Sequence, residues 1–141
     1  MSTRSMPKEK TKDRLELRVE IVADSRYKFN RKQVREAVRK LLEEKGLKGK
    51  VVLSVAVVGE RKMVELRKRY LGEEGVTDVL SFCQTEGEEM PDMEKGLLLG
   101  DVVVCYPQAK RQAVSFKKLL DDEIEFLVLH GVLHLLGVHH D

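Results

Sequence analysis

Apolar residues recur along the chain with two different periods, which predict strands and helices in alternation. Alternating apolar and polar residues are typical of a strand with one buried face, and short β-branched runs are typical of a central strand. Both patterns occur in the part of the chain before residue 106. They predict four strands, at 15–21, 51–59, 77–82 and 97–105, the last interrupted at Gly100-Asp101.

Apolar residues spaced three and four positions apart predict four helices. Asn30 is a suitable N-cap for the first, which ends near Gly46, and Pro107 fits the first turn of the third. Asp121 and Asp122 favour the start of the last helix. Because that helix is apolar on almost all sides, we expect it to be largely buried, with any site on it in a cleft. The second helix should run from about Glu60 to Leu71 and present Met63, Val64, Leu66 and Tyr70 inward.

The order of these elements predicts an α+β (mixed α/β) fold, one mostly four-stranded mixed sheet covered by helices. The strands at 77–82 and 97–105 are joined by an acidic loop at 84–95 that is too short for a crossover, so we expect them to be antiparallel. Residues 1–12 have no periodic apolar pattern and predict a flexible basic tail. Residues 13–141 then form a single domain.

Composition is ordinary for a soluble protein, with 42% hydrophobic and 35% charged residues. There is no run of 18 apolar residues that would predict a membrane span, and the amino terminus lacks the apolar segment of a secretory signal. Cys83 and Cys105 each lie in an apolar, strand-like run, which predicts two buried thiols in a reducing compartment. We therefore expect a cytoplasmic protein.

Basic residues gather in three clusters, although the net charge is only +2. Such clusters could form a positive face that meets a phosphate backbone. They could equally be solvated helix faces with local salt bridges, and the two interpretations stay open. The clusters are Arg31, Lys32, Arg35, Arg39 and Lys40; Arg61, Lys62, Arg67, Lys68 and Arg69; and Lys110, Arg111, Lys117 and Lys118.

All four histidines fall within the last twelve residues. His130 and His134 are four positions apart, so on a helix they share one face. His140 can join them only if the chain turns back, because ten helical residues rise by about 15 Å. Gly137 permits such a turn, since glycine readily takes the left-handed conformation that ends a helix. The spacing predicts three imidazole ligands around one ion with an open fourth position, as in a catalytic zinc site.

Two alternatives to a zinc hydrolase site follow from the same residues. Nickel, copper or iron would also accept imidazole ligands, and histidines on an apolar helix can simply belong to the core. The clustering of the histidines favours the metal. Gly131 follows His130 where zinc proteases carry the glutamate that acts as general base, which argues against peptidase activity.

Four stretches of the chain resemble the YbeY family of bacterial endoribonucleases. They are HGVLHLLGVHH at 130–140, TDVLSF at Thr77–Phe82, LLLGDVVVC at Leu97–Cys105, and a valine-rich strand followed by a helix and a Tyr-x-Gly turn before Thr77. The resemblance implies a zincin-like metal helix, with one zinc ion held by His130, His134 and His140 as the catalytic centre. It also implies cleavage of single-stranded RNA in small-subunit ribosomal RNA maturation, ribosome quality control, and association with the ribosome or its small subunit.

Some residues depart from the family pattern. His139 stands where the family usually has aspartate, and Leu71 stands after Tyr70 where the family commonly has arginine, for which Arg69 is a possible substitute. The family pattern also continues beyond the third histidine, whereas this sequence stops at Asp141. These departures motivate an alternative, a ribosome-associated metal-binding factor with weak or lost catalysis.

The leading hypothesis is a zinc-dependent endoribonuclease. The metal would polarise a phosphoryl oxygen and activate a water molecule, and the RNA 2′-hydroxyl is an alternative nucleophile. Asp78 or Asp101 could orient a ligand histidine through a hydrogen bond, or could serve only as turn or strand-end residues.

Overall fold

The computed structural model describes residues 14–83 and 96–137. One four-stranded sheet has the order β1-β2-β4-β3, with β1 (Leu15–Ala23), β2 (Gly49–Val58), β4 (Leu97–Cys105) and β3 (Val79–Phe82). The first three strands in this order are parallel to one another, and β3 is antiparallel to β4, as predicted. The predicted α+β fold with a mixed sheet is therefore confirmed.

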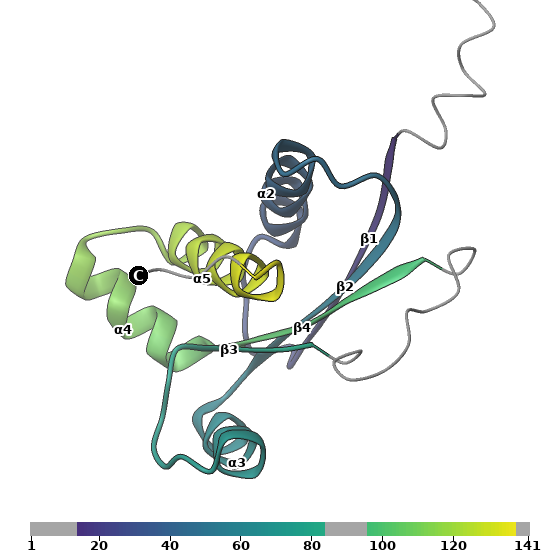
Figure 1. The fold of residues 1–141 in the computed structure, drawn as a ribbon. Helices are drawn as coiled ribbons and strands as arrows, with labels where there is room; N and C mark the ends of the chain where they lie inside the picture. The colour runs from purple at the N-terminus through teal and green to yellow at the C-terminus, as the bar shows by residue number, and fades with distance from the viewer. Residues whose placement is uncertain (1–13, 84–95, 138–141) are drawn as a thin grey trace, which may run out of the picture.

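The helices of the described residues cover both faces of the sheet unequally (Figure 1). Three of them lie on one face, and α3 lies alone on the other. Their bounds are α2 (Arg31–Glu44), α3 (Glu60–Leu71), α4 (Tyr106–Phe116) and α5 (Leu120–Leu135). None of these helices is long and apolar enough to cross a membrane.

The central strand β2 is covered on both faces because its side chains alternate between the two layers. Val51, Leu53, Val55 and Val57 are buried in the large core beneath α2 and α5. Alternate residues of the same strand pack in a smaller core with Met63 of α3. Burial of one such aliphatic side chain contributes about 1.5 to 3 kcal/mol, so this strand anchors both layers.

The predicted starts of three helices are confirmed. The Asn30 side chain accepts a hydrogen bond from the Gln33 backbone N–H at 3.0 Å, and the Asn30 backbone N–H donates to Asp121 Oδ1 at 2.9 Å. This second bond joins the start of α2 to the start of α5. Pro107 lies in the first turn of α4, and Asp121 lies in the first turn of α5.

Three predictions need correction. The strand β4 is continuous through Gly100, because one residue of the chain is accommodated as a register shift against β2 instead of a break. The third strand is shorter than predicted and begins at Val79. Tyr70 was predicted to point inward but is 58% exposed, and its ring packs against Phe82 with the ring centroids 4.9 Å apart.

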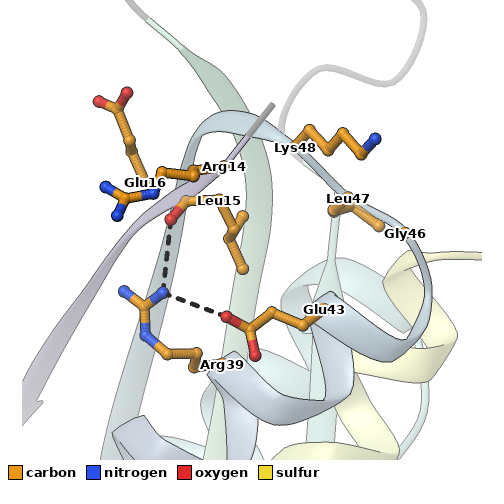
Figure 2. Close-up of a pocket in the computed structure, with 8 residues that line it drawn as sticks. All are labelled: Arg14, Leu15, Glu16, Arg39, Glu43, Gly46, Leu47 and Lys48. Carbon is orange, nitrogen blue, oxygen red and sulfur yellow. Dashed lines mark hydrogen bonds and ion pairs between the residues drawn. The ribbon is translucent and has the colours of Figure 1, made fainter. Parts of the chain in front are cut away.

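Three arginines, one per turn of α2, donate hydrogen bonds to backbone carbonyls of β1. Because β1 is an edge strand, these carbonyls lack a strand partner and would otherwise offer a template for another chain. The donor and acceptor pairs are Arg31–Ile21 at 3.2 Å, Arg35–Val19 at 3.3 Å and Arg39–Leu15 at 3.4 Å. Figure 2 shows Arg39 between the Leu15 carbonyl and the Glu43 carboxylate. For the basic cluster at 31–40, these contacts support the interpretation that its arginines make local interactions within the fold.

A buried carboxylate fixes the turn between α4 and α5. Glu123 is 1% exposed, and its Oε2 accepts a hydrogen bond from Gln112 at 2.8 Å. Its Oε1 lies 2.8 Å from the Lys118 Nζ, an ion pair without the geometry of a good hydrogen bond. Because the Glu123 carboxylate is buried, loss of Lys118 would leave its negative charge without a compensating positive charge.

The two cysteines differ in exposure, so the prediction of two buried thiols is wrong for one of them. Cys105 is 0% exposed in the small core. Cys83 is exposed because it follows the last residue of the short edge strand β3. Burial raises the pKa of the Cys105 thiol, since the thiolate would lose its hydration in this core.

We predict that a thiol-alkylating reagent modifies Cys83 quickly in the folded protein and modifies Cys105 only after unfolding. The thiolate is the reactive form, and both burial and the raised pKa suppress it at Cys105. Mass spectrometry after timed alkylation measures both rates. A Cys83→Ser variant should take up no label while folded, and rapid labelling of that variant would contradict the burial of Cys105.

Candidate functional site

One stripe of α5 is exposed, although the sequence predicted a helix buried on nearly all sides. Exposed residues recur every fourth position, at Asp122, Phe126, His130 and His134. The remaining faces contact the sheet and the neighbouring helices, with Ile124, Leu127, Val128 and Val132 fully or almost fully buried. The helix thus has its large apolar surface in the core and presents both histidines on one outward stripe.

His130 and His134 line a cleft of about 380 Å³ at the β3 edge of the sheet. The cleft is bounded by α5, by β3 with the segment before it, and by the end of α3. This agrees with the expectation that the histidines lie in a cleft. The lining residues are Arg67, Leu71, Glu73, Thr77, Asp78, Val79, Leu80, Ser81, His130, Gly131 and His134.

Ser81 of β3 fixes the ring of His134. Its Oγ lies 2.8 Å from Nδ1 of His134, with the direction of donation set by the tautomer. Nε2 is then the ring nitrogen that would bind a metal ion, and a hydrogen-bond partner on the other nitrogen is typical of metal-ligating histidines. Ser81 therefore orients the His134 ring, and the orientation of a ligand histidine by Asp78 or Asp101 stays a prediction. Of those two aspartates, Asp78 lines the cleft.

The chain leaves the helix at the predicted glycine. Gly137 has φ of 83°, in the left-handed region, and its backbone N–H donates to the His134 carbonyl at 3.0 Å. His139 and the predicted third ligand, His140, lie outside the described residues. Within 14–83 and 96–137, no group of three His, Cys, Asp or Glu side chains could hold a metal ion. The two imidazoles and the Ser81 contact fit a zinc site that needs a further ligand.

Gly131 packs against the sheet with no room for a side chain. A Cβ atom at this position would lie 2.7 Å from Cγ1 and 3.0 Å from Cγ2 of Val102, in β4. A glutamate here would therefore be directed at the buried sheet, and not outward beside the two histidines. The glycine that argued against a protease mechanism is required by packing.

Comparison with known proteins shows the family to which the chain belongs. The family model described as Endoribonuclease YbeY matches residues 18–141. Among similar proteins, the Endoribonuclease YbeY of Desulforamulus reducens is 39% identical over 110 residues, covering 77% of this chain and 72% of that protein. The chain belongs to the endoribonuclease YbeY family.

Two further comparisons, one of sequence and one of structure, show the extent of the likeness to known proteins. The Endoribonuclease YbeY of Frankia alni is 46% identical over 93 residues, which cover 62% of this chain and about half, 51%, of that protein. The solution structure of TM1509 from Thermotoga maritima has a TM-score of 0.55 and 25% sequence identity, covering 88% of this chain and 75% of that chain.

Arg67 is a cleft residue of this YbeY family member that the sequence analysis named only as part of a basic cluster, without placing it beside the histidines. Its Nε lies 3.2 Å from Glu73 Oε1, and its Nη1 donates to the Glu74 carbonyl at 2.8 Å. Arg69, the possible substitute for the family's arginine, is not among the lining residues, whereas Leu71 is. The position of Arg67 could have been predicted from the helical period, because Arg67 and Leu71 are four residues apart and therefore share one face of α3.

A larger cavity, of about 730 Å³, lies at the start of β1, away from the histidines. Figure 2 shows its lining residues. Among them, Arg39 donates a hydrogen bond to the Leu15 carbonyl and forms an ion pair with Glu43. It has no histidine or cysteine, and basic and acidic side chains alternate around it. The smaller cleft is therefore the candidate site, because it contains the two helical histidines of the predicted metal motif.

We predict that Gly131→Ala lowers the free energy of unfolding by about 1 to 2 kcal/mol, because overpacking against Val102 exceeds the gain in helix propensity. Chemical denaturation measures the change. In a Val102→Ala background, which removes the clashing methyl groups, the same substitution should cost much less. An equal cost in both backgrounds would show that the Val102 contact is not the cause.

Proposed function

We propose that this chain is a zinc-dependent endoribonuclease that cleaves single-stranded RNA in the cytoplasm during small-subunit ribosomal RNA maturation and ribosome quality control. Membership of the endoribonuclease YbeY family supports RNA cleavage. The observation that carries the proposal is the placing of His130 and His134 in one cleft, with Ser81 on Nδ1 of His134.

In this proposal His130, His134 and His140 hold the metal ion. When bound, zinc supplies Lewis acidity at a phosphoryl oxygen of the RNA backbone. Ser81 keeps the His134 ring in one orientation, so that no rotation of that side chain is needed when the ion and the RNA bind. The protein thereby contributes two of the ligands, His130 and His134, from a helix that is anchored in the core.

Arg67 is the cationic side chain of the cleft. A guanidinium group has five N–H donors, and the Glu73 and Glu74 contacts use two of them. The remaining donors can contact a phosphate of the bound strand. The Glu73 contact also partly neutralises the arginine, so we expect a modest contribution to RNA affinity.

A second candidate is a ribosome-associated metal-binding factor with weak or lost catalysis. It is favoured by Leu71, which is 50% exposed and lines the cleft where the family commonly has an arginine. Under this candidate the protein would bind zinc and ribosomal RNA without cleaving it at a useful rate. Assays of RNA cleavage and zinc content separate this candidate from the zinc-dependent endoribonuclease.

We expect the purified protein to cleave single-stranded RNA, to lose this activity when a chelator removes zinc, and to regain it when zinc is restored. His130→Ala should lose both the metal and cleavage, because two remaining ligands hold zinc poorly. Elemental analysis and gel-based cleavage assays measure the two properties.

His139→Ala is the matched control, since it removes a neighbouring histidine that is not an expected ligand. It should retain zinc and activity. Cleavage at the full rate after verified zinc removal would contradict metal dependence. Zinc and RNA binding without cleavage would favour the second candidate.

Ser81→Ala should weaken zinc binding about 10- to 100-fold, because the His134 ring loses the group that orients it. Competition titration with a chromophoric chelator measures the affinity. Ser115→Ala is the control, since Ser115 is an exposed serine of α4. Equal zinc affinity in both variants would show that Ser81 has no role in positioning His134.

A further inference from the structure

Phe126 is an exposed aromatic residue next to the candidate site. It is 55% exposed and lies one helical turn before His130 on the outward stripe of α5. Its neighbours Leu127 and Val128 are buried. Single exposed apolar side chains are common on protein surfaces, so the contacts of the ring and its place beside His130 decide what it can do.

Contacts on two sides hold the Phe126 ring. The ring is stacked with His130, with centroids 6.3 Å apart and planes inclined by 29°. The Lys118 Nζ lies over the ring at 4.7 Å from its centroid. Lys118 is itself fixed by its ion pair with the buried Glu123. The ring is therefore oriented by charged and aromatic partners while more than half of the residue stays exposed to solvent.

We propose that Phe126 is a stacking platform for one nucleobase of a single-stranded RNA bound across the cleft. This inference rests on the proposed function. It adds to that function a residue, Phe126, that would select an unpaired base of the RNA. Single-stranded nucleic acid is commonly bound by aromatic side chains on which bases stack, while bases within a duplex have both faces covered. A base on Phe126 would place the adjoining phosphate beside His130.

The surroundings of Phe126 favour a nucleotide over an apolar protein surface. An apolar partner would have to cover the Lys118 amino group and the His130 ring, which costs free energy unless both find new hydrogen bonds. A nucleotide combines a flat aromatic face with polar edges and an anionic backbone. The acidic residue of the same stripe, Asp122, is engaged by Gln33 at 2.9 Å.

The test compares aromatic and non-aromatic side chains at this position. Binding of a fluorescent single-stranded RNA oligonucleotide is measured in the presence of a chelator, which prevents metal-dependent cleavage. Phe126→Ala and Phe126→Leu should each weaken binding about 5- to 100-fold, the range that loss of one stacked base gives, whereas Phe126→Tyr should stay close to the wild type. Phe116→Ala is the control, since Phe116 is 61% exposed on α4.

Abasic oligonucleotides identify the stacked base. At one position of the strand, removal of the base should weaken binding to the wild type but not to Phe126→Ala, because the two changes remove the same contact. In cleavage assays with zinc, Phe126→Ala should raise KM and leave kcat nearly unchanged, as expected when an interaction is equally strong in the ground and transition states. The zinc content of each variant is measured in parallel.

The outcomes separate this inference from the proposed function. Failure of the wild type to bind or cleave single-stranded RNA would overturn the proposed function. A wild type that cleaves RNA, together with Phe126→Ala at wild-type affinity, would overturn only the role of Phe126. Phe126→Leu at wild-type affinity would show that apolar contact suffices without stacking. An equal loss in Phe116→Ala would show that the loss is not specific to Phe126.

Discussion

The close packing of α5 against β4 is the constraint on which the candidate site depends. Gly131 lets the helix approach Val102 so closely that no larger side chain fits between them. This approach buries the apolar faces of α5 and sets its rotation about its own axis. The rotation in turn directs His130 and His134 outward to the cleft beside β3. The contact between Gly131 and Val102 thus determines both the packing of the core and the direction of the two histidines.

Much of the fold could be predicted from the sequence because hydrophobic periodicity decides which faces are buried. The alternation at the start of β1, the β-branched run of β2 and the Asn30 cap all have local causes, and each was found where predicted. The errors have tertiary causes. Tyr70 fits an inward position by its spacing but packs on Phe82 at the sheet edge, and Cys83 is exposed because β3 ends at that edge.

The candidate site was predictable in its helical part and less so in its surroundings. The spacing of His130 and His134 defines one face of a helix whatever the tertiary structure is. Ser81 and Arg67, by contrast, belong to β3 and α3, and only the sheet order and the course of the chain after α3 bring them to the histidines. For Gly131 the sequence suggested a chemical meaning, the lack of a protease's general base, but the structure gives a steric cause, because a side chain there would clash with the sheet.

The arginines along β1 have a consequence for how nucleic acid can bind. Each phosphate that a protein neutralises releases condensed counterions, so affinity falls as salt is added in proportion to the number of such contacts. Arg31, Arg35 and Arg39 have part of their donor capacity taken by the carbonyls of the edge strand. A carbonyl acceptor does not neutralise a guanidinium group, so the α2 side of the molecule keeps its electrostatic attraction for a phosphate backbone, but it has fewer donors left for direct, bidentate contacts with phosphate oxygens.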